Sequence, residues 1–164
     1  MAELIARATM LIRRPRAEVF NAFVQPQLIT KFWLKSTTGR LAAGTQVEWE
    51  FMVPGAKETV TVSGFDEPHR LAFAWSDGIS VDMKFAEERD GATRLSVEAT
   101  GFRGEQPLDQ VVGATEGFTI VLCDLKTLLE TGRSANLVRD KAELIHRAQQ
   151  ETVSAGHKDG NRQP

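Results

Sequence analysis

The side chains that could act as nucleophiles or general bases are few in this chain and lie far apart in the sequence. Among 164 residues there is one cysteine, Cys123, there are three histidines, His69, His146 and His157, and tyrosine is absent. A cysteine beside a histidine could supply a thiolate nucleophile if the fold brought the two together. Cys123, however, falls opposite the apolar stripe of a strongly patterned segment, so we expect it to face away from any apolar cavity. The sequence therefore indicates no nucleophilic site.

Carboxylates are the next candidates for acid–base chemistry, and their positions do not favour it. Glu48 and Glu50 alternate with apolar residues along a strand-like run, so both are expected to point toward solvent. Glu116 is expected near the start of a helix, where a carboxylate interacts favourably with the helix dipole. No glycine-rich phosphate-binding motif occurs. These observations favour binding over turnover, although the sequence leaves open whether the protein is an enzyme.

Composition narrows the class of protein further. Twenty basic residues nearly balance 22 acidic ones, which is not the charge expected of a protein that binds nucleic acid or an anionic membrane. A single cysteine excludes an intrachain disulfide and, with three scattered histidines, argues against a zinc site. No signal region precedes the first strand-like run, and the longest apolar run, residues 71–75, is too short to span a bilayer. We expect a cytoplasmic protein without metal or cofactor.

The most distinctive side chains are apolar and aromatic, and they recur on surfaces predicted to face one another. They can simply fill a core, because each aromatic side chain buries on the order of 150–250 Å². Alternatively they line a ligand pocket, which is typically walled in this way, and the sequence does not decide between the two. The candidate cavity residues are Trp33, Trp49, Phe51, Val62, Phe73, Trp75, Met83, Phe85, Val97, Phe118, Leu122 and Leu125.

Periodicity predicts the elements that position these side chains. Residues 4–12 alternate as a first strand, and Pro15 and Pro26 suit the first turns of two short helices. Two-residue alternation then predicts an antiparallel meander of five strands, at residues 46–51, 59–63, 71–75, 79–85 and 95–99. One face of this sheet should be buried and the other wet.

The second half of the chain is predicted to be helical. Apolar residues recur at three- and four-residue spacing between Gly113 and Gly132, which predicts a long helix with Gly132 at its C-cap. We assign residues 1–132 to one domain. A weaker pattern over residues 133–150 predicts an extra C-terminal helix, and the polar residues 151–164 are expected to form a flexible tail.

The order of these elements resembles the helix-grip fold of the START-like (SRPBCC) superfamily. That resemblance implies an α+β protein in which a curved antiparallel sheet wraps around a long C-terminal helix, with two short helices after the first strand. Motifs that narrow it further are Pro26-Gln-Leu-Ile-Thr-Lys-Phe-Trp33, Gly64-Phe-Asp-Glu-Pro-His-Arg-Leu-Ala-Phe-Ala-Trp75, Asp90-Gly-Ala-Thr-Arg-Leu95 and the closing helix to Gly132. Together they are similar to the subgroup of homologues of the activator of a heat-shock chaperone's ATPase.

The resemblance implies a fold and a cavity rather than a reaction. Helix-grip relatives include lipid carriers, hormone receptors, polyketide cyclases and chaperone cofactors, so the fold alone does not assign a function. The subgroup's closing helix usually carries Gly-Trp where this chain has Gly117-Phe118, which removes an indole N–H donor. The segment beyond Gly132 has no counterpart in the motifs compared.

We therefore predict that the protein binds or carries an apolar or aromatic small molecule in a cavity between the sheet and the C-terminal helix. A second hypothesis is a protein-partner module, such as an activator of a chaperone ATPase. A third is a cyclase or dehydratase in which the shape of the cavity directs the reaction. The sequence leaves open the ligand, a homodimer and the role of residues 133–164.

Overall fold

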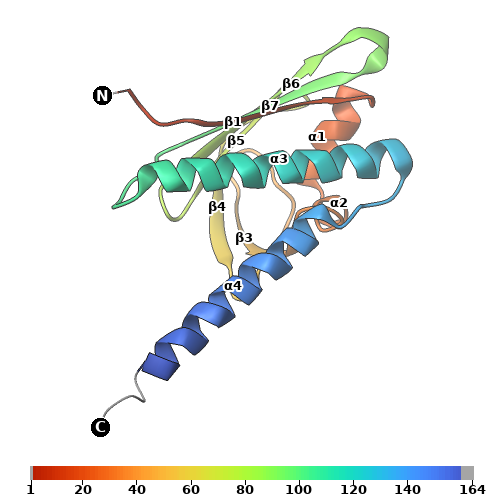
Figure 1. The fold of residues 1–164 in the computed structure, drawn as a ribbon. Helices are drawn as coiled ribbons and strands as arrows, with labels where there is room; N and C mark the ends of the chain where they lie inside the picture. Colours follow the sequence, from red (N-terminus) through yellow and green to blue (C-terminus); the bar gives the residue numbers. More distant parts are fainter. Residues whose placement is uncertain (1, 160–164) are drawn as a thin grey trace.

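The computed structural model describes residues 2–159 and contains a seven-stranded antiparallel sheet with α-helices packed against it (Figure 1). The strands are β1 (Ala6–Ile12), β2 (Leu34–Thr37), β3 (Gln46–Phe51), β4 (Lys57–Asp66), β5 (Arg70–Trp75), β6 (Ser80–Glu87) and β7 (Thr93–Thr100). The helices are α1 (Arg16–Val24), α2 (Pro26–Ile29), α3 (Pro107–Thr131) and α4 (Leu137–Asp159), and a short 3-10 turn spans Arg89–Gly91.

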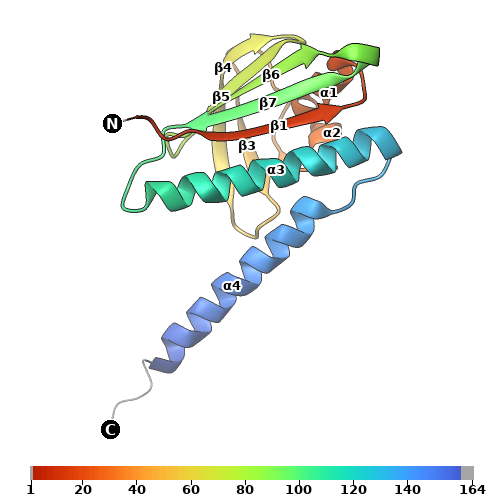
Figure 2. The ribbon, with the colours of Figure 1, turned by 45° about the horizontal axis from the view of Figure 1, so that its top comes forward.

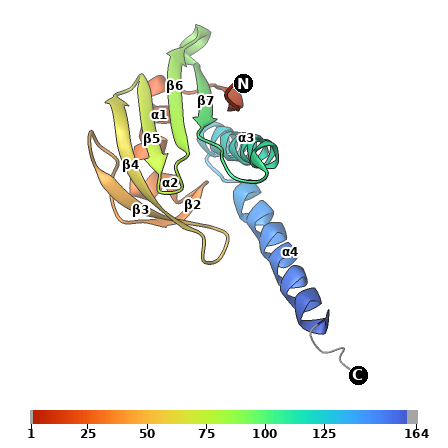
Figure 3. The same cartoon turned by 90° about the vertical axis from the view of Figure 1, so that its left-hand side faces the viewer.

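The strand order, β1-β7-β6-β5-β4-β3-β2, explains how the sheet is built. From β2 to β7 each strand pairs with the next one in the chain, and β1 closes the far edge by pairing with β7. The helices α1 and α2 carry the chain from one edge to the other. Figure 3 shows the sheet curving, with α3 seen nearly end-on beside it. This architecture confirms the predicted α+β, helix-grip fold.

The closing helix α3 lies along β1 (Figure 2) and buries the predicted stripe, including Phe118, Leu122 and Leu125. Gly132 adopts the left-handed conformation, with φ of 82°, and its N–H donates to the carbonyl of Leu128 at 2.8 Å, as expected of a C-cap glycine. The helix begins at Pro107 rather than at Gly113. The prediction missed this start because the first turns are exposed and lack the apolar period.

The earlier start also corrects the interpretation of Glu116. This residue lies in the third turn of α3, beyond the short reach of the helix dipole, and not near the N-terminus. Its carboxylate instead forms an ion pair with Lys141 of α4. The predicted role in stabilising the helix start was therefore wrong.

The strand β2 was not predicted. Its four residues pair with β3 at the edge of the sheet, with an irregularity between Leu34 and Ser36, and Leu34 is the one fully buried member. A strand this short does not show an alternating pattern that a sequence could reveal.

The C-terminal segment also differs from the prediction. The helix α4 continues to Asp159, so residues 151–159, which the sequence predicts to be part of a tail, are helical. This segment contains the good helix formers Glu151, Ala155 and Lys158, and it contains no proline. Residues 160–164 of the expected tail lie outside the described residues. The division of the chain at residue 132 stays a prediction.

A candidate ligand pocket between α3, α4 and the β3–β4 hairpin

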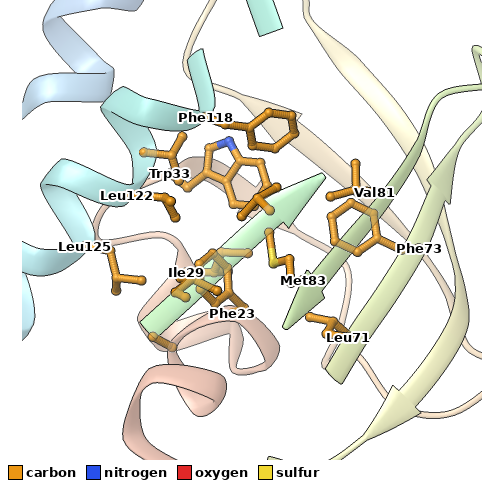
Figure 4. Close-up of a cluster of buried hydrophobic side chains, with 14 of the residues drawn as sticks. Phe23, Ile29, Trp33, Leu71, Phe73, Val81, Met83, Phe118, Leu122 and Leu125 are labelled. Carbon is orange, nitrogen blue, oxygen red and sulfur yellow. The ribbon is translucent and has the colours of Figure 1, made fainter. Parts of the chain in front are cut away.

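Most of the space between the sheet and α3 is filled. Figure 4 shows Leu122 and Leu125 of α3 on one side of this space, with Met83 and Phe73 of the sheet on the other. Eight of the twelve candidate cavity residues lie in this packed core, each at most 5% exposed: Trp49, Val62, Phe73, Met83, Phe85, Val97, Leu122 and Leu125. These side chains belong to the core cluster and are not among those that line the pocket described below.

The short helices complete the filling. Phe20 of α1 meets Phe85 edge-on at a centroid distance of 5.1 Å, and Phe23 meets the same ring at 6.0 Å. Edge-to-face contacts of this kind stabilise a core beyond the area that they bury. Phe20 and Phe23 are at most 1% exposed and belong to the core cluster.

A pocket of about 300 Å³ remains at the other end of that space. The hairpin between β3 and β4 forms one wall, with Phe51, Met52, Val53 and Ala56, and Trp33 and Trp75 lie between this wall and α3. The helices form the remaining walls, with Ala114, Gly117, Phe118, Ile120 and Val121 from α3 and Val138, Lys141, Ala142 and Ile145 from α4. The lining is almost wholly apolar.

Four of the candidate residues meet at this pocket: Trp33, Phe51, Trp75 and Phe118. The rings of Trp75 and Phe118 are nearly parallel, at an interplanar angle of 5° and a centroid distance of 6.1 Å. Trp33 approaches Phe118 edge-on at 6.1 Å, and Phe51 approaches Trp75 at 5.9 Å. These four side chains form a continuous aromatic surface on which a flat guest can stack.

The pocket exists because small residues occupy the helix positions opposite this surface. Ala114 and Gly117 lie three residues apart on α3, and Ala142 faces the pocket from α4. A Cβ atom added to Gly117 would meet no described atom within 4 Å beyond its own neighbourhood, so there is free space beside this glycine. The sequence shows a glycine at position 117. Whether a glycine there leaves room for a ligand depends on the residues that lie opposite it in the structure.

Two polar links position α4 beside α3, one through the segment that joins the two helices and one between the helices themselves. Asp124 of α3 is 1% exposed and accepts hydrogen bonds from the hydroxyl of Ser134 and the backbone N–H of Ala135, both at 2.7 Å. The ion pair between Lys141 and Glu116 joins the two helices at the pocket itself. Lys141 is the charged residue among those lining the pocket, and its partner offsets that charge.

The candidate catalytic residues do not line the pocket. Cys123 is half-buried on α3, His69 is exposed, and His146 is half-buried on α4. The side chain of His157 lies outside the described ones. Within residues 2–159 no cluster of three or more potential metal ligands occurs, and no helix is long and apolar enough to cross a membrane.

Shifted pKa values belong to surface ion pairs rather than to this pocket. Hydrogen bonds from Lys35 and Ser36 lower the pKa of Glu50, which lies on the solvent side of β3. The carboxylate of Asp82 raises the pKa of Arg70 through hydrogen bonds of 3.0 Å. These groups have the environment of structural ion pairs.

Comparison with known proteins identifies relatives of this architecture. The family model described as "Activator of Hsp90 ATPase homolog 1-like protein" matches residues 13–130. Among curated proteins no match is found. The match to the family ends before α4, so the pocket wall formed by α4 lies outside the matched region.

Solved structures share the fold. The protein SSP2350 from Staphylococcus saprophyticus is 27% identical, with a TM-score of 0.71, and the match covers 79% of this chain and 94% of that one. The Aha1 dimer from Colwellia psychrerythraea is 13% identical, with a TM-score of 0.72 and coverage of 82% and 100%. An AHSA1-like protein from Aeromonas hydrophila is 22% identical, with a TM-score of 0.59 and coverage of 77% and 93%.

Proposed function

The chain belongs to the family of activator of Hsp90 ATPase homolog 1-like proteins, and from this premise we propose that it binds an apolar small molecule in the pocket between α3, α4 and the β3–β4 hairpin. The observation that carries the proposal is the apolar pocket beside Gly117, which lies between aromatic rings on one side and α4 on the other. Burial of apolar surface, at roughly 25 cal/mol per Å² before ordering costs, would drive binding.

The dimensions of the pocket limit the guest. Its volume of about 300 Å³ corresponds to about ten water molecules, at roughly 30 Å³ each. This lies at the small end of the range found for ligand pockets. A compact ring system fits this volume and can stack on the surface formed by Trp75 and Phe118, whereas a long lipid chain exceeds it.

Filling the space beside Gly117 tests the proposal. The Gly117→Leu variant places a side chain in the pocket while improving the helix propensity of α3 by roughly 0.5–1 kcal/mol. We expect it to bind 2-isopropenylnaphthalene at least about tenfold more weakly than the wild type, a difference of ~1.4 kcal/mol, without loss of thermal stability. Binding is measured by fluorescence titration, and stability by thermal unfolding.

Gly113 supplies the matched control. It lies one turn earlier on α3, is exposed, and also has free space around an added Cβ among the described residues, yet it does not line the pocket. Gly113→Leu should therefore retain the affinity of the wild type. Equal affinities in both variants, or no binding of the probe by the wild type, would contradict the proposed site.

A second candidate function is a protein-partner module, as the description of the family suggests. The feature in its favour is the distal part of α4, where residues 147–156 are all exposed and the helix projects from the body (Figure 1). Stimulation of a chaperone ATPase by the wild type and by Gly117→Leu alike would favour this candidate over ligand binding. A homodimer, which the Colwellia psychrerythraea protein forms, stays a prediction for this chain.

The third hypothesis, a cyclase or dehydratase, gains no support from the pocket. Such a reaction requires an acid or a base beside the guest. Lys141, the charged residue lining the pocket, is already paired with Glu116.

A further inference from the structure

The side chain of Trp75 carries a hydrogen-bond donor that the protein does not satisfy. Its indole Nε1 is buried and has no hydrogen-bond partner in the part of the chain that the structure describes. Among the described residues, it is the one buried side-chain nitrogen or oxygen atom in this situation. Buried polar atoms in native proteins nearly always have a partner, so an exception calls for a physical explanation. Leaving such a donor unpaired opposes folding, because the group has lost its hydrogen bond to water.

The surroundings of Trp75 explain why the chain offers no acceptor. Trp75 is the last residue of β5, and its backbone N–H already donates to the carbonyl of Ile79 at 2.9 Å. Four aromatic side chains pack against its ring, namely Trp49, Phe51, Phe73 and Phe118, and Nε1 finds no hydrogen-bond partner among the residues described. Phenylalanine has no acceptor, and tryptophan has only a donor.

The pocket is the free volume beside this ring. Trp75 lines it, and the residue as a whole is only half-buried. No protein group within residues 2–159 accepts a hydrogen bond from Nε1, and a guest in the pocket that Trp75 lines could supply the acceptor. Because Nε1 is itself covered in the structure, the indole must turn slightly toward the guest for the bond to form.

The charges at the pocket favour a neutral acceptor. Lys141 forms an ion pair with Glu116, so an anionic guest near this lysine would also meet the carboxylate of Glu116. A carboxylate also loses far more hydration on entering an apolar pocket than a ketone or an ether does. A carbonyl or ether oxygen can accept the bond from the indole without either cost.

We propose that the pocket selects a neutral ring compound bearing a carbonyl or ether oxygen, and that the indole N–H of Trp75 donates a hydrogen bond to this oxygen. This inference rests on the proposed function and specifies the chemical class of the guest. It makes Trp75 the residue that determines specificity within an otherwise apolar site.

Two probes of the same shape test the proposal. In 2-acetylnaphthalene a carbonyl oxygen takes the place of the methylene group of 2-isopropenylnaphthalene. In a pocket without a donor, the ketone loses its hydration and binds more weakly than the alkene. With Trp75 donating, we expect the ketone to bind about five- to tenfold more tightly. The anion of 2-naphthoic acid should bind more weakly than the ketone.

The variant Trp75→Phe keeps an aromatic ring and removes the donor. It should reverse the preference, so that the alkene binds more tightly than the ketone. The Gly113→Leu variant should keep the preference of the wild type, because its substitution lies outside the pocket.

A second measurement does not depend on the stability of a variant. The three tryptophans give three indole signals in the NMR spectrum of 15N-labelled wild-type protein, and Trp75→Phe identifies the one from Trp75 by its loss. Titration with the ketone should move this proton signal downfield, as expected for a new hydrogen bond, and titration with the alkene should not.

The outcomes separate this inference from the proposed function. If both probes bind equally, or the ketone binds more weakly and the Trp75 signal does not move downfield, the inference is overturned. The proposed function then still stands, provided that Gly117→Leu weakens binding of the alkene. If neither probe binds to the wild type, both are overturned.

Discussion

Similar aromatic side chains line both ends of the space between the sheet and α3, yet one end is filled and the other holds a pocket. At the filled end, α3 presents Leu122, and α1 inserts Phe20 and Phe23. At the pocket end, α3 presents the small residues Ala114 and Gly117 beside Phe118, Ile120 and Val121. The size of the residues opposite the aromatic rings therefore decides whether a cavity remains at that end of the space.

The two ends also differ in how firmly their walls are held. At the filled end, Lys126 of α3 donates to the carbonyl of Leu11 at 2.7 Å, and the N–H of Arg13 donates to Glu130 at 3.4 Å. At the pocket end, the wall formed by α4 depends on few links, chiefly the hydrogen bonds of Asp124 and the ion pair of Lys141. We expect the filled end to govern stability and the pocket end to govern binding.

The largest expected effect comes from shortening a side chain at each end. Leu122 is 0% exposed, so Leu122→Ala should lower the free energy of unfolding by about 2–5 kcal/mol. Ile145, in the wall formed by α4, is 38% exposed, and Ile145→Ala should cost about 1 kcal/mol or less. Denaturant unfolding measures both. Similar costs would show that the two ends contribute equally to stability.

An intermediate effect is expected from the link between the helices. Asp124→Ala leaves the hydroxyl of Ser134 and the N–H of Ala135 without their acceptor, which should cost about 1–3 kcal/mol. Amide hydrogen exchange in the first turns of α4 should accelerate, and binding of the naphthalene probes should weaken. The exposed Glu105, which lies outside α3 and α4, changed to alanine, is the control. If the two variants behave alike, Asp124 does not hold the pocket wall.

The smallest expected effect on stability comes from the ion pair between Lys126 and Glu130 at the filled end. A hydrogen bond from Lys126, at 2.6 Å, lowers the pKa of Glu130 below its ordinary value of 4.5, with burial opposing. Because the folded pKa lies below the unfolded one, this carboxylate stabilises the fold above about pH 4.5. That contribution is lost as the pH falls through the folded pKa.

The Glu130→Gln variant measures this contribution. At pH 7 its free energy of unfolding should be lower than that of the wild type by at most about 1 kcal/mol. This difference should disappear as the pH is lowered. Unfolding curves at neutral and acidic pH provide the test. If the difference in free energy of unfolding does not change with pH, the substitution acts through packing and not through the charge of Glu130.

The sequence predicted the long strands and the buried stripe of α3 because side chains alternate along a half-buried strand and recur every three to four residues on a helix. Where this period is absent, prediction failed: β2 is too short to show it, and the first turns of α3 are exposed. The polar composition of residues 151–159 favours a tail, yet these residues are helical in the structure.

The candidate site shows the same limit at the level of single residues. Alternation along the strands correctly indicated that Phe73 and Trp75 point to the same side of β5, but one is 1% exposed in the core and the other lines the pocket. The wall contributed by Ala142 and its neighbours on α4 was not predicted, because it depends on where that helix lies.

By itself, the sequence determined most of the strands and helices, through the periods of its apolar residues, and the order of these elements and the motifs in residues 4–132 indicated the fold and the family by resemblance. Only the tertiary structure decided that most of the candidate cavity is core, and that a pocket remains beside Gly117. The physical reason is that a period specifies the direction of a side chain from its own backbone. Whether that side chain meets another one or an empty volume depends on residues that are distant in the sequence.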